Sequence, residues 1–175
     1  RLDPGMDSGP LLAQAVVPLP PDARAAPLTD ALFWLGARLL VEVLEPYAAG
    51  AVVPREQDHS QATVTRLLKK EDGLVRWELP AVVIERMTRA YDPWPGATSS
   101  WQGQALRLIG AAVRPDWAGA EAPGSLLGHG PAGGPLVATG SGALELLELQ
   151  PAGRRPMAGA AWLQGVRDRD GRFGA

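Results

Sequence analysis

The stretch GSLLGHGPAGGPLVATGSGALELLEL at residues 124–149 decides the fold, because short apolar runs alternate in it with glycine-rich turns. The runs are GSLLG at 124–128, PLVAT at 135–139 and ALELLEL at 143–149. Each run is short and is bounded by residues that favour turns, so each is predicted to form a β-strand. Short strands joined by such turns are typical of an all-β sandwich or barrel rather than a helical bundle.

The residues upstream extend the same pattern. Two further β segments are predicted at LVRW, residues 74–77, and at QALRLIGAAVR, residues 104–114. A helix is predicted between them at 80–91, because Pro80 suits a first helical turn. The apolar face of this helix is formed by Ile84, Met87 and Tyr91, which recur at helical spacing.

The C-terminal end completes the predicted domain. A second short helix is expected at 156–165, and the polar end RDRDGRFGA at 167–175 is expected to fray. Five short strands with an inserted helix favour a small, open Greek-key barrel of the oligonucleotide/oligosaccharide-binding (OB) type. The predicted fold class of this part is therefore mainly β, an OB-like barrel.

The N-terminal part follows a different pattern. PLLAQAVV at 10–17 is predicted to be a buried strand, and 27–49 a helix with an apolar residue at every third or fourth position. Gly50 is placed to cap this helix, and Pro46 is expected to kink or fray its last turn. Residues 51–68 are polar and lack a sustained period, so they are predicted to form an extended linker.

Composition limits the class of protein. Hydrophobic residues make up 46% of the 175 residues, so a packed core is expected. Cysteine is absent, which excludes disulfides and thiolate metal sites, and no apolar run reaches the ~18 residues of a membrane span. The net charge is −2, whereas residues 69–175 carry twelve basic and eleven acidic side chains, a net charge of +1. Binding of nucleic acid by this part would have to come from the arrangement of its charges.

Four segments, taken together and in order, resemble the methionyl-tRNA formyltransferase family. They are LDPGMDSGPLLAQ at 2–14, QDHSQAT at 57–63 with LLKKEDGLVRW at 67–77, RAYDPWPGA at 89–97, and LELLELQPAGRRPM at 144–157. None is specific alone, but the four keep the family's order and spacing across nearly the whole chain. Val64, Arg76 and Asp92 depart from the pattern, since the family usually has Tyr, Asp and Asn there.

The resemblance implies transfer of a formyl group from 10-formyltetrahydrofolate to the amino group of methionine on initiator tRNA, in translation initiation. It also implies a Rossmann-like α/β catalytic domain, a linker and a tRNA-binding barrel. Residues 1–50 would be a strand and helix from the end of the catalytic domain, 51–68 the linker and 69–175 the OB-like domain. A cytoplasmic monomer is expected, with folate and tRNA as ligands and with neither a metal nor a membrane partner.

Asp7, in GMDSGP, matches the family's catalytic carboxylate. In the family this carboxylate keeps a His protonated, and the His faces the oxyanion of the tetrahedral intermediate. Gly5 and Gly9 are expected to let the loop turn tightly and approach the folate. The alternative is a simple Asx turn before a strand.

Two further elements of the family's active site are not found in this sequence. They are an Asn-any-His triplet and a Ser-Leu-Leu-Pro folate loop, both upstream of the aspartate in the family. This chain alone is therefore expected to be inactive. Its two histidines, His59 and His129, are expected to be surface residues.

Basic side chains are the candidates for binding tRNA phosphates. They are Lys69, Lys70, Arg86, Arg89, Arg154 and Arg155. Solvated surface charge is the competing interpretation of each cluster, and Glu85 can pair with Arg89 at helical spacing. Trp94 and Trp101 are candidates for stacking on bases, although the position of Trp94 between two prolines favours core packing at the helix exit.

Two other functions remain open. One is a different folate-dependent formyltransferase, acting on an amino sugar nucleotide. The other is a free-standing nucleic-acid-binding barrel without catalysis. The LKKEDG and LQPAGRRPM stretches favour the tRNA enzyme. Assays of the intact enzyme with tRNA and with the sugar nucleotide would separate the tRNA enzyme from the sugar-nucleotide enzyme.

Overall fold

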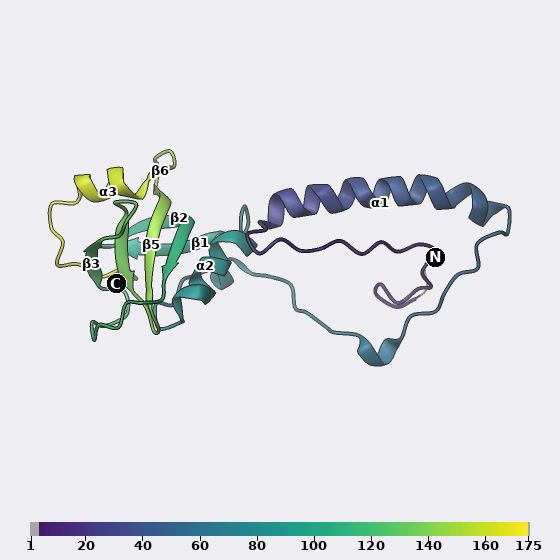
Figure 1. Ribbon diagram of the computed structural model, residues 1–175, viewed down its shortest axis with the longest axis horizontal. Coiled ribbons are helices and arrows are strands. Elements are labelled where there is room, and N and C mark those ends of the chain that lie inside the picture. Colours follow the sequence, from purple (N-terminus) through teal and green to yellow (C-terminus); the bar gives the residue numbers. More distant parts are fainter. Residues whose placement is uncertain (1–3, 175) are drawn as a thin grey trace. The chain divides into compact units, whose positions relative to one another are not determined.

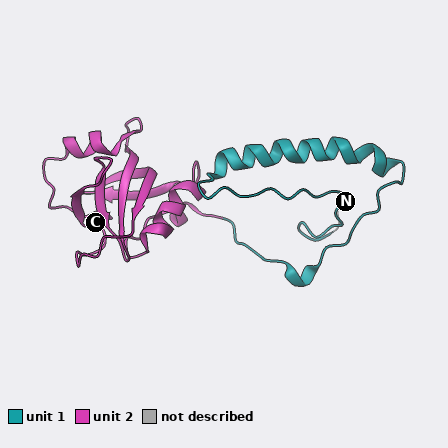
Figure 2. Cartoon of the chain, in the orientation of Figure 1, with its two compact units in different colours: residues 1–67 teal, residues 68–175 magenta. Residues whose placement is uncertain are grey.

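The computed structural model describes residues 4–174. The chain divides into two compact units, residues 1–67 and residues 68–175 (Figure 2). The first unit is built around one long helix and extended segments, and the second around an antiparallel sheet (Figure 1).

Helix α1, Ala25–Ala48, is the main element of the first unit. Its end confirms the predicted glycine cap, because Gly50 adopts a positive φ of 75°. The Gly50 N–H donates to the Tyr47 carbonyl at 3.0 Å, and the Ala51 N–H donates to the Pro46 carbonyl at 2.9 Å. These two bonds form a Schellman motif, which satisfies carbonyls that the helix leaves free.

The strand predicted at residues 10–17 is wrong. The only pairing described there is an isolated antiparallel bridge between Leu11 and Arg55. A buried strand requires neighbouring strands on both sides, whereas Val16 is 93% exposed. The segment after the bridge runs extended without a partner in the part of the chain that the structure describes.

The second unit is a mainly antiparallel β structure, as predicted. Its main strands follow the order β1-β2-β5-β4-β3, and β6 pairs with β5. The bounds are β1 Ala97–Trp101, β2 Gln104–Arg114, β3 Leu126–His129, β4 Pro135–Ala138, β5 Ala143–Pro151 and β6 Met157–Ala158. Because β2 pairs with β5 rather than with β3, the connections cross over as in a Greek key.

Strand β1 was missed in the sequence, and the segment 74–77 was wrongly predicted as a strand. Its backbone bonds β1 where the Val75 N–H donates to the Thr98 carbonyl at 2.8 Å, and the Trp77 indole N–H donates to the Ser99 hydroxyl at 3.0 Å. The chain then turns, since the Leu79 N–H donates back to the Arg76 carbonyl at 3.1 Å. No ladder can therefore develop along it.

Helix α2, Ala81–Ala90, confirms the predicted inserted helix and packs against the sheet. Ile84 is fully buried, and Met87 is 9% exposed. Helix α3, Gly159–Gly165, begins later than predicted because β6 occupies the residues before it. A short 3₁₀ turn, η2 at Lys70–Gly73, opens the second unit.

One carboxylate lies within the core of the second unit. Glu145, on β5, is fully buried and accepts hydrogen bonds from Arg114 and from the backbone N–H groups of Ala132 at 2.8 Å and Gly134 at 3.2 Å. A side chain at Gly130 would collide with it. Glu145 therefore holds the β3–β4 turn, and the glycines of that turn make room for it.

The C-terminal residues join the two edges of the sheet. Phe173 bridges Trp101 at the end of β1, and Arg172 bridges Ser125 beside β3. The Phe173 N–H donates to the Gly124 carbonyl at 2.8 Å, and the Phe173 ring is only 3% exposed. The prediction that this end frays is wrong, because Phe173 fills the core and its backbone spans the opening of the barrel.

Candidate functional site

The loop that carries Asp7 is an exposed bend in the first unit. Its left-handed residue is Asp7 itself, with φ of 54°, and not either of the neighbouring glycines. Aspartate adopts this conformation more readily than most residues. Asp7 is exposed to solvent, while Gly9 is half-buried.

Gln57 holds this loop from a distance of about fifty residues in the chain. Its side-chain amide donates to the Asp7 carbonyl at 2.8 Å and to the Gly9 carbonyl at 2.7 Å. The next contact lies beside it, since Leu11 and Arg55 exchange backbone hydrogen bonds of 2.8 and 2.9 Å. The QDHSQAT segment thus contacts the GMDSGP segment, and sequence reasoning missed Gln57 because nothing local marks such a contact.

The rest of the QDHSQAT segment forms its own turn. Asp58 caps the 3₁₀ turn η1, His59–Gln61. Hydrogen bonds from the Ser60 hydroxyl, then from the Gln61 amide and the Ser60 N–H, lower the pKa of the Asp58 carboxyl from its usual value. These groups stabilise the charged form, so the cap is complete at neutral pH and weakens only as acid protonates the carboxylate.

Lys69 and Lys70 lie at the start of the second unit and are both exposed. The Lys69 N–H donates to the Asp72 carboxylate at 2.7 Å. This bond ties Asp72 to the backbone of the turn and leaves the lysine side chains at the surface.

The two arginines of α2 differ in their surroundings. Arg89 forms a bidentate pair with Glu85, with N–O distances of 2.6 and 3.0 Å, and both side chains are mostly buried. Arg86 is exposed. The competing role suggested by the sequence for Arg89, an ion pair along the helix, is therefore present.

Arg154 and Arg155 are exposed in the β5–β6 turn. Figure 1 shows β6 and α3 at one end of the barrel and α2 at the other. The structure thus separates these arginines from Arg86 and Arg89, so the basic clusters do not form one short patch.

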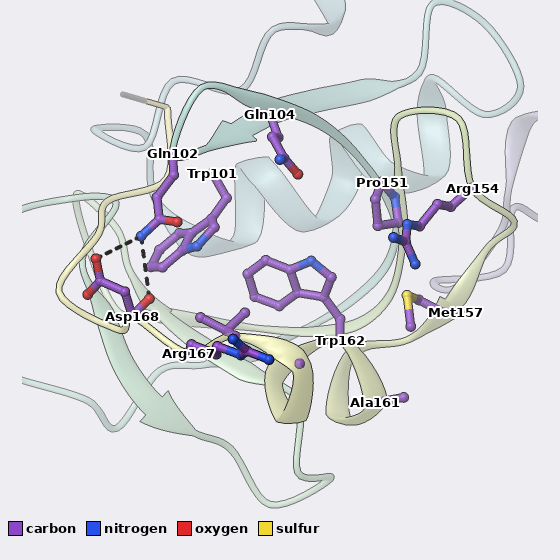
Figure 3. Close-up of a pocket in the computed structure, with 12 residues that line it drawn as sticks. Trp101, Gln102, Gln104, Pro151, Arg154, Met157, Ala161, Trp162, Arg167 and Asp168 are labelled. Carbon is purple, nitrogen blue, oxygen red and sulfur yellow. Dashed lines mark hydrogen bonds between the residues drawn. The ribbon is translucent and has the colours of Figure 1, made fainter.

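A pocket of about 450 Å³ lies between the β1–β2 turn, the β5–β6 turn and α3 (Figure 3). Arg154 lies at one side of it and Arg167 at the other, with Trp162 between them (Figure 3). Sequence reasoning identified Arg154 but not Trp162 or Arg167, because their grouping depends on how α3 folds back onto the sheet.

The structure reverses the environments expected for Trp94 and Trp101. Trp94 is 57% exposed, so its predicted packing in the core is wrong. Two residues that flank Trp94 in the sequence contribute to the core in its place: Ala97 belongs to the core cluster, and Tyr91 packs against it. Trp101 is 6% exposed and belongs to the core, so its ring is not open to stack on a base.

His59 and His129 are both exposed, as expected. Between residues 4 and 174, no three His, Asp or Glu side chains gather closely enough to hold a metal ion. None of the helices described in this range has the length and apolar character needed to cross a membrane.

Comparison with known families and proteins gives one matching family model, described as formyl transferase, C-terminal domain, over residues 67–167. A methionyl-tRNA formyltransferase of Chloroflexus aggregans is 68% identical over 166 residues, which are 95% of this chain and 53% of that protein. One of Roseiflexus sp. is 55% identical over 166 residues, which are 95% of this chain and 50% of that protein. This chain therefore spans about half the length of the relatives it matches.

Solved structures show the same fold. A variant of HypX from Aquifex aeolicus has a TM-score of 0.66 at 22% identity, covering 95% of this chain and 30% of that chain. HypX in complex with tetrahydrofolic acid has a TM-score of 0.62 at 21% identity, covering 92% of this chain and 28% of that chain.

Proposed function

The chain belongs to the formyl transferase family through its C-terminal domain, and on this premise we propose that it is the C-terminal half of a methionyl-tRNA formyltransferase. The complete protein, a cytoplasmic monomer, transfers the formyl group of 10-formyltetrahydrofolate to the amino group of methionyl initiator tRNA. The observation that carries the proposal is the high identity to enzymes of that name over nearly the whole chain.

Residues 1–50 are the end of the catalytic domain in this proposal, 51–68 the linker and 69–175 the tRNA-binding domain. Helix α1 supports the first assignment, because its large apolar side chains are exposed. Phe33 is 75% exposed and Trp34 79% exposed. Apolar surface of this extent is normally buried against other parts of a protein. In the complete protein, the half that this chain does not span would bury it.

Formyl transfer requires an amine to attack the formyl carbon, an oxyanion to be held, and a proton to leave the nitrogen. We assign Asp7 the role of keeping the catalytic His charged, with that His supplied by the other half of the protein. The exposed carboxylate of Asp7 is free to meet such a partner. Gly5 and Gly9 flank it without side chains, so the folate substrate can approach the backbone there.

A formylation assay of the complete protein tests the proposal. Methionyl initiator tRNA and 10-formyltetrahydrofolate should give formylmethionyl-tRNA, and an amino sugar nucleotide should not be formylated. Formylation of the sugar nucleotide alone would identify the other formyltransferase class. Binding of tRNA without formylation of either acceptor would favour the non-catalytic barrel.

The proposed tRNA contacts comprise the six basic side chains identified in the sequence. Lys69, Lys70 and Arg86 are exposed and available, and Trp94 offers an exposed ring for stacking. Arg89 would have to share its guanidinium with Glu85. Arg154 and Arg155 would contact a different part of the tRNA.

The double variant Lys69→Ala/Lys70→Ala should weaken binding of many tRNAs alike. Each lost phosphate contact lowers the slope of log affinity against log salt by roughly 0.7–0.9, so the slope should flatten by up to about two. Titrations of tRNA at several salt concentrations measure it. Arg38→Ala, which removes an exposed charge on α1, is the control and should leave the slope unchanged.

An unchanged slope in the double variant would show that the two lysines are solvated surface charge. Loss of binding to initiator tRNA alone would show that they recognise its shape rather than its phosphates.

Gln57 is proposed as a positioning residue for the Asp7 loop. In the complete enzyme, Gln57→Ala should lower kcat about tenfold, equivalent to about 1.4 kcal/mol, because the loop loses both side-chain hydrogen bonds. The KM for tRNA should change little. Gln61→Ala is the matched control, since Gln61 binds Asp58 within the same segment and not the loop.

Steady-state kinetics of the two variants measure the difference. Equal kcat in Gln57→Ala and Gln61→Ala would show that the loop keeps its position without Gln57.

A further inference from the structure

The pocket of about 450 Å³ beside α3 has the size of a small-ligand site. Its lining combines two indole rings, apolar side chains, two glutamine amides, two arginines and one carboxylate (Figure 3). The residues that carry the argument are Trp162, Pro151, Met157, Gln104, Arg154 and Arg167.

Trp162 is a fixed aromatic platform. Its ring centroid lies 5.7 Å from that of Trp101, edge-on at 84°, and 5.7 Å from that of Phe173, tilted at 42°. These core rings hold the indole in place, and it remains only half-buried. A preordered ring loses little conformational freedom when a flat ligand stacks on it.

Three of the polar side chains around the platform are not engaged elsewhere. Among residues 4–174, the side chains of Gln104, Arg154 and Arg167 have no hydrogen-bond or ion-pair partner. The pocket's carboxylate is occupied, since Asp168 accepts hydrogen bonds from the Gln102 amide at 3.1 Å and from the Asp170 N–H at 3.0 Å. The free groups are therefore an amide, which can donate and accept, and two cations.

We propose that this pocket binds one unpaired nucleotide of an RNA strand. The base stacks on Trp162 between Pro151 and Met157, its edge is hydrogen-bonded by Gln104, and the neighbouring phosphates are held by Arg154 and Arg167. This inference rests on the proposed function, in which tRNA is the substrate. It adds a site specific for a single-stranded part of that substrate.

The chemistry of the lining favours a nucleotide over other ligands. Stacking on aromatic rings beside basic side chains is the way proteins hold single-stranded nucleic acid. A free anion would leave the indole unused, and an apolar group would leave both arginines unused. Base-paired RNA keeps its bases stacked on one another, so it cannot offer a ring to Trp162.

The experiment measures the affinity of the complete protein for a fluorescently labelled single-stranded RNA tetranucleotide, by anisotropy, with a blunt RNA duplex for comparison. Trp162→Leu should weaken tetranucleotide binding about 5- to 150-fold, the range of one base stack. Trp162→Phe should retain most of the affinity. Trp117→Leu is the matched control, because that partly exposed tryptophan lies outside the pocket.

Two surface variants keep the test independent of folding. Arg154→Ala/Arg167→Ala should flatten the salt slope of tetranucleotide binding by about 1.4, since each single-strand phosphate contact contributes about 0.7. Gln104→Leu should reduce the difference in affinity between tetranucleotides of different bases. Gln104, Arg154 and Arg167 are exposed, so these changes leave the core intact.

Equal affinities of the parent and all three pocket variants would overturn the proposal, and so would tighter binding of the duplex than of the tetranucleotide. Formylation by the parent separates this failure from failure of the proposed function. A parent that formylates methionyl-tRNA, with pocket variants that bind as it does, refutes the pocket alone. If the parent does not formylate methionyl-tRNA but the pocket variants bind the tetranucleotide more weakly than the parent, the proposed function is refuted and the pocket is supported.

Discussion

Replacement of Asp7 by Asn in the complete protein is expected to lower kcat about a thousandfold or more, while the Kd for tRNA stays nearly unchanged. Asparagine keeps the shape of the side chain and tolerates the left-handed backbone, which has φ of 54° at this position. Only the negative charge is lost. In the role proposed for Asp7, the partner His would then lose its positive charge near neutral pH, and the oxyanion would lose its partner.

Single-turnover formylation and tRNA titration together measure this effect. Asp22→Asn is the matched control, because Asp22 is an exposed carboxylate in a turn of the same unit. It should leave both quantities unchanged. Near-normal turnover of Asp7→Asn would remove Asp7 from the catalytic centre.

Phe173→Ala should have the largest effect on stability, lowering the free energy of unfolding of the second unit by about 3–5 kcal/mol. The ring is 3% exposed and lies 4.7 Å from Trp101 and 5.4 Å from Trp77, measured between centroids. Its loss would leave a cavity among large rings that cannot close around it.

Urea unfolding monitored by tryptophan fluorescence measures the change. Trp94→Ala is the control, because its ring is 57% exposed and should contribute little. A decrease below about 1 kcal/mol for Phe173→Ala would mean that the C-terminal segment is not part of the cooperative core.

The sequence predicted the elements that have a strong local pattern. Strands β2, β4 and β5 and helix α2 lie within a few residues of their predicted bounds, because apolar periodicity and glycine-rich turns are local properties. Strand β1 was missed because Ala, Thr and Ser do not form an apolar run. The sequence signal for β1 was the Gln102-Gly103 pair after it. In the structure both residues adopt positive φ, 49° and 75°. Two such residues between strands form a tight hairpin.

The candidate site was less accessible from the sequence. Asp7 was identified only through family resemblance, since its bend is otherwise ordinary turn chemistry. Gln57 and Phe173 act on residues far away in the chain, and no local pattern reports such contacts. The pocket depends on α3 bringing Trp162 beside Trp101, which is a property of tertiary packing.

The closure of the barrel by residues 172–174 also sets an order of events on the ribosome. Strands β1 and β3 are made long before these residues, so both edges of the sheet stay unpaired while the nascent chain grows. Exposed strand edges pair readily with other chains. The domain can complete its ring only after residues 172–174 have left the exit tunnel, and until then its unpaired strand edges are surfaces that chaperones can protect.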